Sequence, residues 1–455
     1  MILRNKSIRY TLLFASFMFI QFVILRLANQ SGRGYLPETL QEKVYLFIQI
    51  AAILGFLTYA LFRSFAGIQK LYKPFSAVMM AILVASSLIM LFCSPASLFY
   101  LIVTGVGVLL LGFIGGAVYE RLALSVNDQR YTGLCIGIGY AVAVALQFCL
   151  QLQWTVTPAL AFFLLISFIL LSILLLRNYQ IQEAETSTNE KTTVSRSTLV
   201  FSVVITSALL LFTSYYNSYI HHLQIASGYT DYNVYSWPRL LMIPTVILFG
   251  FLGDIKGGKF LPVCTLCVAA IALLNTALLD QNTYLLNMCL YYVALTAVIA
   301  YYHVTFLRLA EHTKHPALWA CMGRVIDSAI VILSFGLRIS TQSQVVVLII
   351  NITALAAAII TMTLSGALNL SAPITDKTKP AAEVDPFPIV QKSFGITPAE
   401  LKVLRELTQT DDKQEVIASR LNISVSTLRH HITSLYKKTG VQTRLALSNL
   451  VNTQK

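Results

Sequence analysis

The chain has 455 residues, of which 56% are hydrophobic and only 12% are charged, and its mean hydropathy is +0.70. Soluble domains carry roughly 25% charged residues, so this composition excludes a protein that is dissolved in water over most of its length. The net charge is +13, and the charged residues are unevenly distributed along the chain. Residues 8–366 form a series of long apolar runs, and charged residues return to ordinary density from residue 370 onward. The sequence therefore predicts a membrane domain, residues 1–370, followed by a smaller water-exposed domain.

The apolar runs predict about twelve membrane-spanning helices, because a hydrocarbon core about 30 Å thick needs roughly 20 apolar residues in a helix. Arg4, Lys6 and Arg9 precede the first run, as in a signal peptide, but no small-x-small cleavage site follows, so we interpret this run as the first span. The eighth run is the shortest. The predicted spans are 9–27, 44–62, 75–93, 97–119, 132–150, 157–176, 198–220, 238–252, 260–279, 285–307, 319–337 and 344–366.

The distribution of basic residues predicts the orientation of these spans. With the N-terminus inside, the cytoplasmic segments hold 15 Lys and Arg residues and the outer loops hold five. Cytoplasmic loops carry such an excess, so we expect both termini in the cytoplasm of a multi-pass protein of the cell membrane.

A motif follows the eighth span. The polar loop 177–197 divides the spans into two sets of six, and inverted or parallel repeats of spans are typical of transporters. The motif reads Gly250-Phe-Leu-Gly-Asp254-Ile-Lys256-Gly-Gly258-Lys259. It resembles the loop signature of the major facilitator superfamily, which implies that fold. The signature normally lies between spans two and three; here segment 62–70 stands at that place and contains no acidic residue.

The spans contain few ionisable residues. Arg324 and Asp327 are three positions apart in the eleventh span and share one face of a helix; Asp327 would lie about 13 Å deep at 1.5 Å per residue. Ionisable residues at such depth are costly and usually functional, so this pair is a candidate sensing site for an unknown small-molecule ligand, with a structural ion pair as the alternative. The aromatic clusters 215–217 and 301–303 are expected to be interfacial anchors, with cavity lining as the alternative.

Beyond the spans, residues 371–393 contain four prolines and predict a linker, and residues 394–455 predict a small four-helix domain. Thr397, Pro398 and Glu400 form a capping box that begins the first helix. Residues 412–415 begin the second helix, and Ser424 begins a third, which runs through Thr439. The fourth helix follows a cap at residue 443. Two helices separated by three or four residues, the second of them basic, predict a helix-turn-helix.

This domain resembles the LuxR-type (GerE-like) DNA-binding domain over its whole length. The pattern that carries the resemblance is Ile417-Ala418-x-x-Leu421-x-Ile423-Ser424-x-x-Thr427-Leu428-x-x-His431-x-x-x-Leu435-x-x-Lys438-x-Gly440-Val441-x-x-Arg444. Thr439 departs from the family's leucine before the glycine, and one residue is inserted within 408–415. The resemblance implies a prokaryotic protein that binds double-stranded promoter DNA as a homodimer.

The resemblance also assigns the DNA contacts. The third helix would enter the major groove, where Arg429, His430 and Thr433 would contact the bases. The residues that would contact phosphates are Thr427, Lys437, Lys438 and Arg444. An ion pair involving the fourth helix is the alternative role of Arg444. In this family the fourth helix pairs two domains, so Leu445, Leu447 and Leu450 are candidate dimer contacts.

The sequence therefore predicts an all-α protein that couples a ligand or membrane signal to DNA binding. The alternative is a transporter with a fused regulatory domain. No catalytic constellation or phosphate-binding loop is present, and Cys264-x-x-Cys267 lies in an apolar run without a second ligand pair. We expect no enzymatic activity, no cofactor and no metal site.

Overall fold

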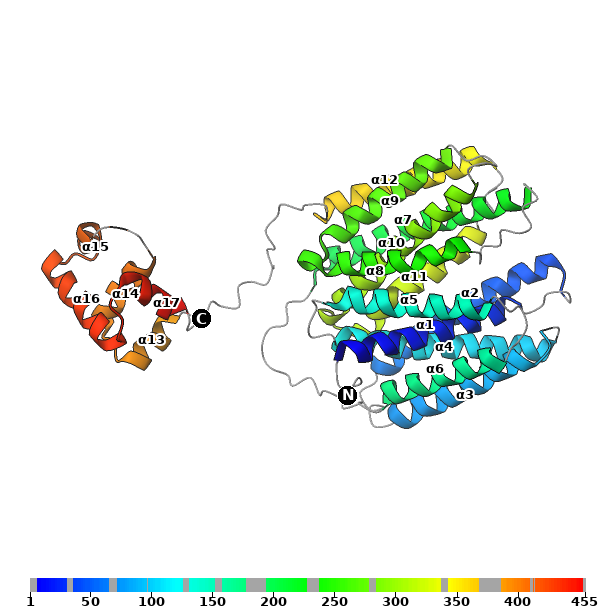
Figure 1. The fold of residues 1–455 in the computed structure, drawn as a ribbon, viewed down its shortest axis with the longest axis horizontal. Helices are drawn as coiled ribbons and strands as arrows, with labels where there is room; N and C mark the ends of the chain where they lie inside the picture. Colours follow the sequence, from blue (N-terminus) through cyan, green and yellow to red (C-terminus); the bar gives the residue numbers. More distant parts are fainter. Residues whose placement is uncertain are drawn as a thin grey trace. The chain divides into compact units, whose positions relative to one another are not determined.

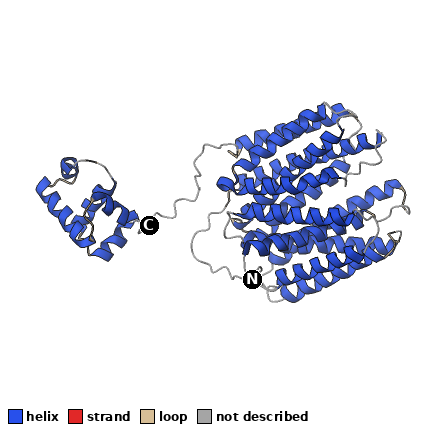
Figure 2. Cartoon of the chain, viewed as in Figure 1, coloured by secondary structure: helices blue, strands red, loops and turns tan. Residues whose placement is uncertain are grey.

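The computed structural model describes residues 6–30, 36–64, 72–95, 97–125, 131–151, 158–176, 194–226, 237–277, 284–336, 343–367, 386–409, 412 and 414–452. These residues form helices and connecting turns, without any strand among them (Figure 2). The chain divides into two compact units, Met1–Ser371 and Ala372–Lys455, called unit 1 and unit 2 below. The predicted all-α class is confirmed for the described residues.

Unit 1 contains a helix at each of the twelve predicted spans (Figure 1). Two 3-10 helices, η4 (Trp237–Leu241) and η5 (Ile255–Gly258), flank the eighth. The α-helices are α1 Lys6–Asn29, α2 Glu38–Ser64, α3 Tyr72–Phe92, α4 Leu98–Ser125, α5 Thr132–Gln151, α6 Pro158–Leu176, α7 Arg196–Ala226, α8 Met242–Asp254, α9 Phe260–Ala277, α10 Tyr284–Glu311, α11 Pro316–Gly336 and α12 Gln344–Leu364.

Eleven segments among the described residues are long and apolar enough to cross a membrane, which makes the chain a multi-pass membrane protein. Helix α8 is short, as predicted, but its flanking 3-10 helices extend the apolar segment to 22 residues, Trp237–Gly258. The segment that falls short is the ninth, Phe260–Asn275. Large apolar side chains cover the outside of unit 1, and among the described residues Val416 is the one exposed large apolar side chain of unit 2. An apolar exterior suits hydrocarbon rather than water.

The packing of unit 1 repeats after six helices. Helix α2 packs on α4, α1 on α5 and α6, and α3 on α4 and α6; in the same way α8 packs on α10, α7 on α11 and α12, and α9 on α10 and α12. The two sets of six meet where α5 packs on α8 and where α2 packs on α11. At the first of these contacts the backbones touch, since a β-carbon at Gly133 would lie 2.2 Å from the backbone oxygen of Gly250.

The described residues of unit 2 form an apolar core and five helices: α13 Pro386–Phe394, α14 Pro398–Gln409, α15 Gln414–Arg420, α16 Val425–Thr439 and α17 Arg444–Asn452. The last four lie where the capping patterns predicted them. The prediction that residues 371–393 form a linker is wrong for its final residues, because they belong to helix α13. Proline is tolerated in the first turn of a helix, and Phe387 (5% exposed) and Val390 (0% exposed) are part of the core. Residues 371–385 of that linker lie outside the described residues.

Candidate functional site

The turn between α15 and α16 is held by side-chain and backbone caps. Asn422 adopts a left-handed conformation with φ of 53°, which asparagine tolerates better than most residues. The hydroxyl of Ser424 then accepts a hydrogen bond of 3.1 Å from the backbone N–H of Thr427. At the other end, Gly440 has φ of 71° and terminates α16. The predicted caps of α16 are confirmed, and together they fix the direction in which this helix leaves the turn.

Helix α16 has one buried and one exposed face. Leu428, Ile432, Leu435 and Thr439 are buried in unit 2. The opposite face carries exposed side chains that recur at helical spacing. We call this the outer face of α16, formed by Ser426, Thr427, Arg429, His430, Thr433 and Lys437. It carries the basic residues Arg429 and Lys437 and contains no acidic residue.

Arg429 is positioned by its neighbours. Its Nε–H donates a hydrogen bond of 3.1 Å to Oε1 of Gln414, at the start of α15. Thr433 bonds the carbonyl oxygen of Arg429 through its hydroxyl, at 2.9 Å. Arg429 is exposed, and among the described residues no partner bonds the two terminal nitrogens of its guanidinium group. Sequence reasoning did not single out Gln414, because its role depends on the packing of α15 against α16.

Lys438 has a partner within unit 2, and its predicted phosphate contact stays a prediction. Its Nζ donates to a carboxylate oxygen of Glu400 at 2.7 Å and to the carbonyl oxygen of Gly395 at 3.0 Å. The same carboxylate accepts hydrogen bonds from Ser434 at 2.6 Å and from the backbone N–H of Thr397 at 2.7 Å. Burial acts to raise the pKa of Glu400, but these hydrogen bonds outweigh it and lower the pKa to about 2. Lys438 therefore links α16 to the start of α14.

Arg444 likewise bonds within unit 2. Its Nε–H donates to the carbonyl oxygen of Leu407 at 2.8 Å, and its Nη1 donates to the carbonyl oxygen of Asp412 at 2.8 Å. The first of these carbonyls lies in the last turn of α14, where helix carbonyls lack intrahelical donors. Arg444 therefore caps α14, and the phosphate contact and the ion pair given for it from the sequence both stay predictions.

The three predicted dimer contacts on α17 differ in how accessible their side chains are. Leu447 is 0% exposed and belongs to the core of unit 2, so its side chain is not available to a second copy. Leu450 is half-buried against the same core. The side chain of Leu445 lies outside the described residues.

In unit 1, the predicted pair is an ion pair. Nη1 of Arg324 lies 2.5 Å from Oδ2 of Asp327 and donates a second hydrogen bond to the hydroxyl of Tyr302 at 3.3 Å. The side chains of Arg324 and Asp327 are 15% and 28% exposed. The pair therefore lies within the helix bundle, where each charge is compensated by the other.

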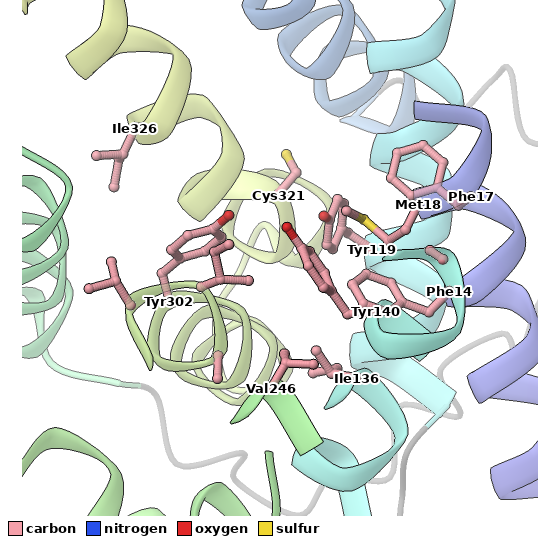
Figure 3. Packing of buried hydrophobic residues seen from close by; sticks show 14 of the residues in the cluster. Phe14, Phe17, Met18, Tyr119, Ile136, Tyr140, Val246, Tyr302, Cys321 and Ile326 are labelled. Atoms are coloured by element: carbon pink, nitrogen blue, oxygen red, sulfur yellow. The ribbon is translucent and has the colours of Figure 1, made fainter. Parts of the chain in front are cut away.

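The aromatic side chains of the two clusters that the sequence singles out are buried in unit 1. Tyr302 and His303 are 1% and 2% exposed, and Tyr216 is 0% exposed. The prediction that the clusters 215–217 and 301–303 are interfacial anchors is wrong for these residues, since their rings face the interior of the bundle. Figure 3 shows Tyr119, Tyr140 and Tyr302 between α4, α5, α10 and α11. The hydroxyl of Tyr119 donates to Nε2 of His303 at 2.9 Å, because Nδ1 of that ring bonds the carbonyl oxygen of Ile299.

The signature after α8 has a structural role. The carboxylate of Asp254 accepts hydrogen bonds from the backbone N–H groups of Gly133 and Leu134, at the start of α5, and from Arg308 of α10 at 3.2 Å. The first six helices contain a corresponding ion pair with the acid and the base exchanged. There the base, Arg63, lies at the end of α2 and the acid, Glu120, lies on α4, and their charged atoms are 2.9 Å apart. The acid that segment 62–70 lacks is thus supplied by another helix.

The chain therefore presents two candidate sites of different chemistry. The outer face of α16 offers positive charge and hydrogen-bond donors to an extended polyanion. The interior of unit 1 offers the ion pair of Arg324 and Asp327, with the hydroxyl of Tyr302 as a hydrogen-bond partner of Arg324. No protein-family model and no curated protein matches this chain.

Proposed function

We propose that the chain is a membrane-bound transcription regulator of one component. Unit 1 responds to a small molecule or a membrane signal, and unit 2 binds promoter DNA as a homodimer. The observation that carries the proposal is the outer face of α16: a capped helix, preceded by a short helix and a tight turn, with an exposed basic face and no acid. Such a helix matches the width of the major groove, about 12 Å.

The outward side chains supply the two kinds of contact that DNA recognition needs. The terminal nitrogens of Arg429 can bond O6 and N7 of guanine together, and Gln414 orients the guanidinium group for this. His430 and Thr433 are neighbours on the same face. Lys437 and Thr427 lie toward the two ends of the helix and suit phosphates, which position a protein without reading sequence. Lys438 and Arg444 act within unit 2, where they hold α16 and α14 in place.

Unit 1 anchors this activity in the cell membrane. Its eleven apolar segments support permanent residence in a bilayer, and the excess of basic residues in alternate loops supports a cytoplasmic location for both termini. Unit 2 would then share a compartment with the chromosome. The partly buried ion pair of Arg324 and Asp327 is the proposed centre of the response, since charges in a membrane interior are seldom kept without a function.

The decisive experiment uses unit 2 alone, residues 372–455, which has its own core. The purified unit is mixed with a pool of random duplexes, and the bound fraction is sequenced after several rounds. We expect enrichment of one palindromic sequence and a binding constant that falls steeply with salt. Recovery of a random pool, or binding that is insensitive to salt, contradicts the proposal.

One observation favours a second function, a transporter with a fused regulatory unit. The packing of unit 1 repeats after six helices, and internal repeats of spans are typical of transporters. The test is the metabolite content of cells that produce residues 1–371 alone, measured by mass spectrometry. A transporter changes the level of its substrate, whereas a sensor leaves all levels as they were.

A further inference from the structure

The arginines of unit 2 differ in which of their guanidinium nitrogens are engaged. Nη1 and Nη2 of Arg420 each donate to a carboxylate at 2.6 Å. Nε and Nη1 of Arg444 donate to backbone carbonyl oxygens, and the guanidinium group of Arg405 lies over a phenylalanine ring, 4.9 Å from its centre. In Arg429, Nε donates to Oε1 of Gln414 at 3.1 Å, and among the described residues no partner bonds Nη1 or Nη2. The end of this guanidinium group is therefore where a molecule from outside unit 2 can bind.

The engaged nitrogen limits how Arg429 can bind. A guanidinium group offers its donors as a planar fork, either side-on through Nε and one terminal nitrogen or end-on through both terminal nitrogens. Nε carries a single N–H, which is donated to Gln414, so the end-on fork remains. In the major groove, guanine presents two acceptors, N7 and O6, whereas adenine presents an acceptor beside a donor. An end-on fork of two donors therefore fits guanine and not adenine.

Gln414 also keeps Arg429 from contacts that carry no sequence information. An unrestrained arginine side chain has several rotatable bonds and can reach phosphate oxygens, which are the same at every base pair. The bond to Gln414 comes from α15, a different helix, and it removes part of that freedom before DNA binds. Because the acceptor is an uncharged amide, the guanidinium group keeps its positive charge for DNA. Arg420 is the contrast, since two carboxylates oppose its charge.

We propose that Gln414 determines the specificity of unit 2 for one guanine in each half of its palindrome. By holding Nε of Arg429, it restricts this residue to an end-on contact with N7 and O6 of that guanine. Gln414 is a positioning residue, since it acts through Arg429 and from outside α16. The inference rests on the proposed function, because it names the base pair that the outer face of α16 recognises.

The test uses the palindrome selected by residues 372–455 and two analogues of guanine. 7-Deazaguanine has a C–H group in place of N7, whereas hypoxanthine keeps N7 and O6 and lacks the amino group in the minor groove. Each guanine in one half of the palindrome is replaced in turn, and binding is measured by titration. We expect one position at which 7-deazaguanine weakens binding by about fivefold to tenfold, and at which hypoxanthine leaves binding within about twofold. At this position Arg429→Ala should bind the two analogues equally.

Two substitutions separate the role of the acceptor from that of the side chain as a whole. Gln414→Met keeps the length but removes the acceptor, so the penalty for 7-deazaguanine should fall below about twofold, while binding to random duplexes is unchanged. Gln414→Glu keeps an acceptor oxygen and should keep the penalty, although its charge weakens binding to all duplexes alike. Gln442→Met, at an exposed position between α16 and α17, is the matched control and should behave like the native unit. Urea unfolding checks that each variant is folded.

The inference is overturned if Gln414→Met keeps the native penalty, or if Gln414→Glu loses it. It is also overturned if the penalty survives in Arg429→Ala, because another residue of the outer face, such as His430, then reads the guanine. A selected palindrome in which no guanine is sensitive to 7-deazaguanine contradicts this inference and leaves the proposed function standing. A unit that selects no sequence contradicts the proposed function, and the inference falls with it.

Discussion

The carboxylate of Asp254, at the end of α8, accepts a hydrogen bond of 2.8 Å from the backbone nitrogen of Gly133, at the start of α5. Its second oxygen accepts from Leu134 at 2.7 Å. The first N–H groups of a helix have no intrahelical partner, and a carboxylate satisfies both hydrogen bonding and the helix dipole there. A residue of the second six helices therefore caps a helix of the first six, and the two sets are joined at this end.

This relationship predicts the effect of removing the cap. Asp254→Ala should destabilise unit 1 by about 1–2 kcal/mol, the cost of losing a helix cap, and lower the unfolding temperature of the full chain in detergent. Asp254→Asn keeps one acceptor oxygen and should lose less. The exposed residue Ser64, at the end of α2, provides a control as Ser64→Ala. If Asp254→Ala unfolds at the native temperature, the bridge between α8 and α5 does not stabilise the fold.

On the outer face of α16, Arg429 and Lys437 should behave differently on DNA. A bidentate arginine–guanine contact discriminates by about 1–3 kcal/mol, so Arg429→Ala should narrow the gap between the selected duplex and a random one. Losing a phosphate contact weakens binding to all sequences alike and reduces the salt slope by about one, so Lys437→Ala should lower both affinities equally. Titrations at several salt concentrations separate the two effects. An unchanged specificity ratio in Arg429→Ala would remove this residue from the base-reading role.

The contact between Lys438 and Glu400 predicts that unit 2 becomes less stable to unfolding in acid. The pKa of Glu400 is about 2 in the folded unit, below its ordinary value of 4.5. The unfolded state therefore binds more protons between these values, and the stabilisation is fully present above about pH 5 and is lost as the pH falls toward 2. Its size is about 1–2 kcal/mol after allowance for solvent screening.

The measurement is urea unfolding of residues 372–455 between pH 2.5 and 7. Lys438→Met should flatten the dependence by removing one of the donors to Glu400, and Lys437→Met, at the exposed neighbouring position, should not. Equal pH profiles for the two variants would show that the contact between Lys438 and Glu400 has no energetic weight.

Helix α13 predicts where unit 2 can be cut. Phe387 and Val390 fill its core, and Arg405 lies 4.9 Å from the centre of the Phe387 ring. A fragment that begins at residue 394 lacks both side chains and should lose about 3–5 kcal/mol, in the range of large-to-small core substitutions. Urea unfolding of fragments 372–455 and 394–455 checks this, with Phe387→Ala in the longer fragment as a partial loss. Equal midpoints would mean that α13 packs without stabilising the unit.

The orientation of unit 1 is testable without a ligand. Reporter domains inserted at residues 187 and 229 lie in successive loops of the predicted topology, on opposite sides of the membrane. A phosphatase reporter should be active at residue 229 and inactive at residue 187, and a fluorescent reporter should give the reverse. The same result at both positions would exclude an odd number of spans between them.

Features set by neighbouring residues were predictable from the sequence. The caps at Ser424 and Gly440 and the capping box of Thr397 and Glu400 lie where their spacing predicted, because each depends on residues three or four positions apart. Helix α13 escaped prediction because its two prolines are typical of linkers and its core contribution depends on the helices that cover it.

Contacts between distant residues were not predictable. The bonds of Lys438 and Arg444 to α14 and its neighbourhood had no signal in the sequence, because their partners are more than 30 positions away. Such roles arise from tertiary packing, which local patterns do not encode.

The apolar exterior of unit 1 has a consequence for how a promoter is found. A soluble regulator searches the chromosome by diffusing to it, but a protein whose surface is fitted to hydrocarbon moves only within the plane of the bilayer. For the proposed function, the search is then performed by the DNA, and a locus is regulated only when its own motion brings it close to the membrane. Gene position on the chromosome, and tethering of that region by transcription or replication, would set the rate of response as much as the affinity of α16.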